Sequence, residues 1–166
     1  MRTFGYIATT ITTLVALTSS SLVMAEISAT KPAVSVNLSA YEISMNKKGE
    51  SVVKPVQQVK PNDIIEYRAT YTNNTTKTIN GLVATLPIPA DTQFLAKSTP
   101  AQAQASTDGI NFAAMPLKRK VGTKTVNVPL QEYRALRWTI AELPAGKSVI
   151  VTAQTRVNST TSAVAQ

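Results

Sequence analysis

Residues 59–74 read VKPNDIIEYRATYTNN, and this stretch decides the fold. Its first part, Lys60-Pro61-Asn62-Asp63, is typical of a turn. After the turn, apolar and polar side chains alternate without a break. The apolar positions are Ile65, Tyr67, Ala69 and Tyr71, and the polar positions are Glu66, Arg68, Thr70 and Thr72. Because successive side chains of a strand point to opposite faces, this alternation predicts a half-buried strand of an antiparallel sheet.

Shorter alternating stretches recur along the chain at spacings of about 8–14 residues, which is typical of all-β folds. They cover residues 34–45, 82–86, 92–96, 101–106, 133–140 and 149–157. No segment in this part of the chain has the period of a convincing amphipathic helix. The sequence therefore predicts an all-β, antiparallel β-sandwich of roughly seven to nine strands.

The apolar phase changes once within residues 34–45. Even-numbered positions are apolar up to Ala40, and odd-numbered positions are apolar from Tyr41 to Met45. One extra residue in a strand has this effect, so the pattern predicts a β-bulge or two strands that meet at a corner.

The beginning of the chain has the features of a cleaved signal peptide. Arg2 gives a short positive start, residues 7–23 carry no charge, and Val23-Met24-Ala25 fits the site that a signal peptidase reads. The alternative is a membrane anchor, but threonines and serines interrupt the apolar run and make it a poor permanent span. We expect a signal peptide at residues 1–25, a sandwich domain at 26–158 and a flexible tail at 159–166, with no permanent membrane span after cleavage.

The composition excludes several kinds of chemistry. The chain has no histidine and no cysteine, so it has no Ser-His-Asp triad, no cysteine nucleophile, no disulfide and no zinc site with His or Cys ligands. Its acidic residues, among them Asp63, Glu66, Asp91 and Asp108, are scattered and lack the spacing of a calcium loop. We therefore predict that the protein is not an enzyme and has no catalytic residue, metal or cofactor.

Residues 115–130 are the least regular and most basic part of the chain. They contain the cations Lys118, Arg119, Lys120 and Lys124, with Gly122 at an expected turn. Two structures fit this segment: a hairpin of residues 117–121 and 125–128, or a long loop over one end of the sandwich. In a chain of net charge +8, these cations are a candidate contact for an anionic ligand, although a solvated loop explains them too. Proteins that bind single-stranded nucleic acid place aromatic residues between the basic ones, and residues 115–130 contain none. We therefore expect no nucleic acid as a partner.

Three motifs, in this order, resemble the bacterial conserved-repeat domain DUF11. Residues 60–74 are similar to its opening turn and strand, residues 82–87 (LVATLP) to its next strand, and residues 136–149 (LRWTIAELPAGKSV) to its closing part. The resemblance spans roughly residues 53–157 as a single copy, with Asn62 where the family usually has glycine. It implies an immunoglobulin-like sandwich in a cell-envelope or bacterial surface protein, and it brings no catalytic residues.

Together these features predict a non-enzymatic protein that is exported to the periplasm, the cell surface or the medium. We expect a small protein-binding or assembly module whose partner is another envelope protein. The alternative is a recognition domain that binds an anionic glycan or lipid head group through residues 118–124.

The predicted export fixes where the mature chain begins. Cleavage after Ala25 leaves Glu26 as the first residue, because Val23-Met24-Ala25 is the only convincing cleavage signature. Intact-mass measurement of the exported protein checks this prediction, and a mass that still includes residues 1–25 would contradict it.

Overall fold

A computed structural model describes residues 31–159 of the chain. The predicted signal peptide, residues 1–25, lies outside the described residues, and so does the predicted tail apart from Ser159. Within residues 31–159, no helix has the length and apolar character needed to cross a membrane.

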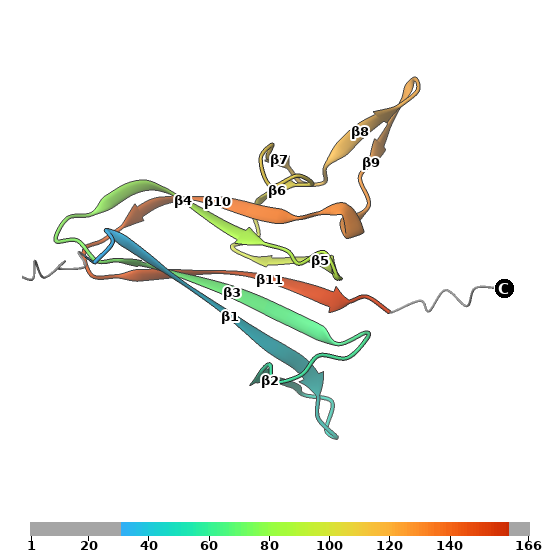
Figure 1. Ribbon diagram of the computed structural model, residues 1–166, viewed down its shortest axis with the longest axis horizontal. Helices are drawn as coiled ribbons and strands as arrows, with labels where there is room; N and C mark the ends of the chain where they lie inside the picture. The colour runs from blue at the N-terminus through green and yellow to red at the C-terminus, as the bar shows by residue number, and fades with distance from the viewer. Residues whose placement is uncertain (1–30, 160–166) are drawn as a thin grey trace, which may run out of the picture. The chain divides into compact units, whose positions relative to one another are not determined.

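The described part is a sandwich of two antiparallel sheets (Figure 1). The five-stranded sheet has the order β2 (Ser51–Pro55), β1 (Val34–Met45), β3 (Ile64–Asn73), β11 (Ser148–Val157) and β5 (Thr92–Thr99). The four-stranded sheet has the order β4 (Ile79–Pro87), β10 (Ala135–Leu143), β6 (Gln104–Ser106) and β7 (Ala113–Ala114). The predicted all-β sandwich is confirmed, and the strand number lies in the expected range because the two sheets together contain nine strands.

Two further strands and one helical turn lie outside these sheets. Strands β8 (Lys118–Val121) and β9 (Lys124–Asn127) pair only with each other. A single 3₁₀ turn, η1 (Leu130–Glu132), is the only helical element within residues 31–159.

Strand β3 lies at the centre of the five-stranded sheet in the predicted register. It pairs with β1 on one side and with β11 on the other. Ile65, Ala69 and Tyr71 are buried on its inward face, and Tyr67 on the same face is half-buried. Asn62 in the preceding turn has a φ of 72°, a left-handed conformation that asparagine tolerates better than most residues.

The core lies between the two sheets. Phe94 of β5 and Tyr133 are fully buried, and their rings stack with centroids 6.0 Å apart. Leu86 and Leu136 of the four-stranded sheet and Val151 of β11 belong to the same buried cluster. Burial of each such side chain stabilises the fold by about 1.5–3 kcal/mol. With no cysteine in the chain, this packing has to stabilise the sandwich without disulfides.

Strand β1 is continuous, so the predicted bulge or corner inside it is wrong. Its register with β3 runs without a shift. Val36 and Leu38 lie opposite Tyr71 and Ala69 and share their inward face, because directly paired residues lie on one face of a sheet. From Tyr41 onward, the apolar side chains of β1 lie on the outward face, because Tyr41 and Ile43 lie opposite the outward residues Glu66 and Ile64 of β3. The apolar phase changes because the two halves of one strand use opposite faces.

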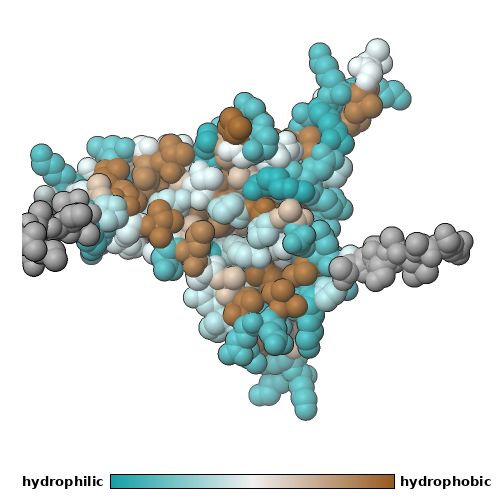
Figure 2. Space-filling model, viewed as in Figure 1, coloured by the Kyte–Doolittle hydropathy of each residue, from teal (hydrophilic) through white to brown (hydrophobic). Residues whose placement is uncertain are grey.

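The inward face of the first half of β1 is only partly covered. The four-stranded sheet packs over β3 and β11, and Val36 and Leu38 remain 51% and 58% exposed. A groove of about 260 Å³ lies beside them, lined by Leu38, Tyr67, Leu86 and Pro89 among others. Figure 2 shows several hydrophobic side chains at the surface of the visible side of the sandwich. Strand β1 thus presents apolar side chains that the sandwich itself leaves in contact with solvent.

The connectivity matches the immunoglobulin pattern in one sheet. Strands β1, β3, β11 and β5 correspond in spatial and chain order to strands A, B, E and D of that fold. In the other immunoglobulin sheet, the strand that pairs with strand C comes after strand E. Here β10, which pairs with β4, comes before β11. The second sheet therefore differs from immunoglobulin topology, although the sandwich architecture is the same.

The hydroxyl of Tyr71 links the two sheets at the free edge of β4. It donates to the carbonyl oxygen of Thr85 at 2.6 Å and accepts from the Thr85 amide at 2.8 Å. The main-chain amide and carbonyl of Thr85 therefore face away from β10. Pro87 faces the same edge two residues later and has no N–H to offer. An edge with few free backbone groups pairs poorly with other chains, so this hydroxyl also protects the edge of the sheet.

Tyr71→Phe should lower the free energy of unfolding by about 1–2 kcal/mol, because it removes the partner of two backbone groups. Tyr67→Phe is the matched control. Burial alone raises the pKa of the Tyr67 hydroxyl, with no contribution from a hydrogen bond, so this variant removes a hydroxyl without removing a hydrogen-bond partner. The control should change stability by about 0.5 kcal/mol or less. Urea denaturation of both variants measures the difference, and equal losses would show that the Tyr71 hydroxyl does not link the sheets.

Candidate functional site

The four predicted cations lie on a hairpin that stands apart from both sheets. Of the two structures that the sequence allowed, the hairpin is observed: β8 and β9 pair antiparallel, and Gly122 at the tip has a φ of 59°. Both four-residue strands are exposed along their whole length. In Figure 1 the hairpin extends away from the sandwich beyond β6 and β7. Both faces of the hairpin are therefore largely open to solvent.

The base of the hairpin is fixed by buried groups. Leu117 and Val128 flank the two strands, are both 8% exposed, and are joined by a hydrogen bond from the Val128 amide to the Leu117 carbonyl at 2.8 Å. The Leu117 amide donates to the hydroxyl of the fully buried Tyr133 at 2.8 Å. The hairpin thus emerges from the core at a defined position.

Strand pairing separates the four cations into two pairs. Lys118 lies opposite Asn127 and Lys120 opposite Thr125, so these residues form one face of the hairpin, here called the lysine face. The other face, here called the valine face, consists of Arg119, Val121, Lys124 and Val126. The cations are therefore close in the fold but do not form a single positive surface.

One of the four cations has an ion-pair partner among the described residues. The Arg119 guanidinium contacts the carboxylate of Glu132 in η1 at 2.6 Å, with the two side chains 48% and 40% exposed. An ion pair this exposed contributes only about 0–1 kcal/mol to stability. Within residues 31–159, Lys118, Lys120 and Lys124 form no ion pair, so their charges are directed at solvent.

The other arginines of this region do not extend the hairpin surface. Arg134 donates to the main-chain oxygens of Gln131 and Tyr133 at 2.6 and 2.8 Å, which gives it a structural role beside η1. Arg137 of β10 stacks on Phe112 instead, with its guanidinium carbon 3.5 Å from the ring centroid.

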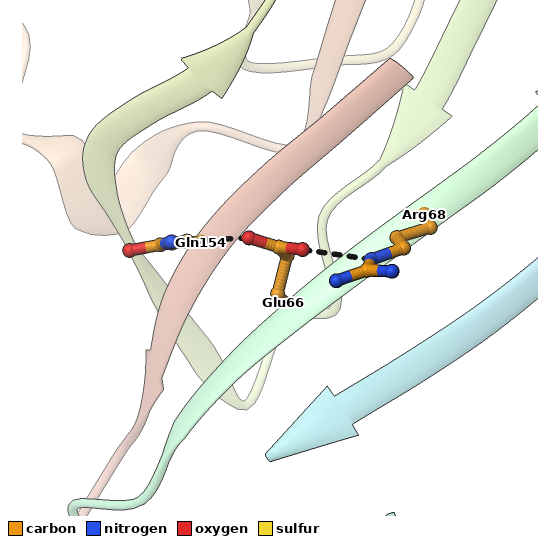
Figure 3. Close-up of polar contacts among 3 residues, drawn as sticks. All are labelled: Glu66, Arg68 and Gln154. Carbon is orange, nitrogen blue, oxygen red and sulfur yellow. Dashed lines mark hydrogen bonds and ion pairs between the residues drawn. The ribbon is translucent and has the colours of Figure 1, made fainter. Parts of the chain in front are cut away.

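The acidic residues within 31–159 do not gather into one cluster. Glu66 accepts hydrogen bonds from Arg68 at 2.7 Å and from Gln154 at 3.0 Å on the outward face of the five-stranded sheet (Figure 3). Asp108 accepts from Asn111 and its neighbours in the turn after β6, and these hydrogen bonds hold the pKa of Asp108 well below its usual range. Within the described residues, no group of three or more acidic side chains could hold a metal ion.

Sequence reasoning located the cations but missed the groups that hold them in place. Tyr133 begins the alternating stretch 133–140, but this pattern predicted neither the burial of Tyr133 nor the partner of its hydroxyl. Glu132 had no pattern that connected it to Arg119. Both contacts depend on the return of the chain after β9.

Comparisons of the chain with protein-family models, with curated proteins and with solved structures gave no match. The likeness to DUF11 therefore stays a prediction. Any proposal about function has to be argued from the geometry of the surface.

The buried hydroxyl of Tyr133, rather than the exposed ion pair, should hold the base of the hairpin. Tyr133→Phe leaves the Leu117 amide buried without a partner and should lower the free energy of unfolding by about 1–3 kcal/mol. Glu132→Gln is the control and should change it by about 0.5 kcal/mol or less. Chemical denaturation separates the two, and a larger loss for Glu132→Gln would reverse this assignment.

Proposed function

We propose that the chain is a non-enzymatic, exported protein of the bacterial cell envelope, located in the periplasm or at the cell surface. It acts as a small protein-binding or assembly module, and its contact surface is the β8–β9 hairpin. The observation that carries this proposal is the full exposure of a hairpin whose base is held by the core. The signal-peptide features of residues 1–25 and the resemblance to DUF11 support the location.

An isolated two-stranded hairpin is only marginally stable in water. This hairpin nevertheless exposes Val121 and Val126, at 58% and 38%, on one face. A partner that covered these side chains would gain their burial and would order the hairpin at the same time. The fold thus leaves Val121 and Val126 exposed to solvent, and a second protein surface can bury them.

The composition of the valine face favours a protein as the partner. Protein interfaces combine an apolar centre with a polar rim, and arginine is enriched in them. Val121 and Val126 provide the apolar part, and Arg119 and Lys124 provide charge around it. The complementary surface is an apolar patch bordered by carboxylates on another envelope protein.

The lysine face supports the second candidate function, recognition of an anionic glycan or lipid head group. Lys118, Lys120, Thr125 and Asn127 lie on it, and none of these side chains is apolar. A contact of this kind depends on charge alone, so it would weaken as salt screens exposed charges. The two candidate functions therefore use opposite faces of one hairpin and can be tested separately.

Site-specific photo-crosslinking in the producing cells tests the leading proposal. A photoreactive residue at Val126 should give one discrete protein adduct, and the same residue at Ile150, which is 50% exposed on β11, should not. Reversal of Arg119 and Lys124 to glutamate should reduce the adduct at least tenfold, whereas reversal of Lys118 and Lys120 should leave most of it. The melting temperature should not change measurably, because exposed charges contribute little to stability.

Two results would contradict the leading proposal. Equal adducts at Val126 and Ile150 would show that the hairpin is not a specific contact. Binding of purified protein to anionic vesicles or an anionic polysaccharide, lost in Lys118→Glu/Lys120→Glu and retained in Arg119→Glu/Lys124→Glu, would favour the second function.

A further inference from the structure

A second surface, separate from the hairpin, lies where the short strand β6 ends. Strand β6 pairs with β10 only from Ala135 to Arg137, so the next residues of β10 have no neighbouring strand on that side. A cleft of about 540 Å³ occupies this position. Its lining includes Gln102, Gln104, Met115, Arg137, Trp138 and Thr139. A cleft of this volume is in the range of small-ligand sites.

Arg137 is the unusual group in this cleft. Its guanidinium lies over the Phe112 ring at 3.5 Å, and this stacking holds the plane of the cation in one orientation. Its Nε is buried and has no hydrogen-bond partner among residues 31–159. Buried polar atoms in folded proteins nearly always have such a partner.

The other arginines with described contacts show the contrast. Arg68 and Arg119 each contact a carboxylate, and Arg134 donates to main-chain carbonyls. Arg137 forms neither an ion pair nor a hydrogen bond with any described residue. An oriented cation without an acceptor in a cleft is the arrangement expected of an anion-binding residue.

We propose that this cleft binds an acidic saccharide unit whose carboxylate pairs with the guanidinium of Arg137. Guanidinium and carboxylate match each other as two parallel hydrogen-bonding forks. The amides of Gln102 and Gln104 and the hydroxyl of Thr139 supply the donors and acceptors that sugar hydroxyls require. Met115 and several alanines give the cleft an apolar wall for the ring carbons.

The single tryptophan of the chain makes the proposal directly measurable. Trp138 lines the cleft, and no second tryptophan contributes to the emission. Titration of the exported full-length chain with trigalacturonate should give a saturable change in this emission. Galactotriose, which has the same size without the carboxylates, should give none.

Variants assign the binding to Arg137. Arg137→Gln should weaken trigalacturonate binding at least tenfold, and Arg137→Lys should also weaken it because lysine lacks the planar fork. Arg156→Gln is the matched control, since it removes the same charge from an exposed position on β11 and should leave affinity unchanged. Phe112→Leu keeps the charge and removes the stacking partner, so it should weaken binding even where Arg137→Gln fails to fold.

The opposite results would overturn the proposal. Equal losses in Arg137→Gln and Arg156→Gln would mean that diffuse positive charge attracts the ligand. Equal affinity for galactotriose would remove the role of the carboxylate. Displacement of trigalacturonate by equimolar inorganic phosphate, or by a short peptide through its terminal carboxylate, would show a general anion site and overturn the saccharide assignment. None of these results depends on the hairpin.

Discussion

The ends of several strands depend on the buried side chain of Asn73, the last residue of β3. Its Nδ2 donates to the carbonyl oxygens of Lys77 at 2.7 Å and Leu143 at 2.9 Å, and its Oδ1 accepts from the Thr75 amide at 2.9 Å. Its main-chain amide donates to the carbonyl oxygen of Lys147 at 2.9 Å. A buried amide is stabilising only when its donors and acceptors all have partners. Asn73 meets this condition only if the β3–β4 loop and the β10–β11 turn lie in one position, so it sets how the two sheets join at this end.

The parts of the fold that depend on local pattern were predictable, and those that depend on distant partners were not. The inward and outward residues of β3 follow from alternation, since a strand has only two faces. Asparagine favours turns, so Asn73 at the end of its strand is predicted to be a turn residue. Its burial could not be predicted, because it depends on a hydrogen bond to Leu143, 70 residues away. In β1, alternation revealed an apolar face in each half of the strand, but only the pairing with β3, which puts Tyr41 opposite the outward Glu66, determines that Tyr41 lies outward.

The same division applies to the candidate sites. The cations of the hairpin were visible in the sequence, and the shared face of Lys118 and Lys120 follows from their spacing within one strand. The face of Lys124 depends on the length of the turn that brings it opposite Val121. For Arg137, alternation with the apolar Leu136 and Trp138 places the side chain on the outward face, but the stacking on Phe112 and the missing acceptor arise from the return of a distant loop. Both proposed surfaces depend on contacts between distant segments, and a single sequence carries little information about such contacts.

The hairpin and one wall of the Arg137 cleft belong to one connection, residues 100–132, which lies between β5 and β10. It contains β6 and β7, part of the wall of the Arg137 cleft, and the whole hairpin. Two core side chains hold it: Trp138 Nε1 donates to the carbonyl oxygen of Pro100 at 2.7 Å, and the Tyr133 hydroxyl accepts from the Leu117 amide at 2.8 Å. Both bonds reach main-chain atoms of the connection, so they do not depend on which side chains it carries. The sandwich can therefore keep the connection in place while the residues that contact a partner or a ligand change, as in other proteins whose binding loops rest on a rigid scaffold.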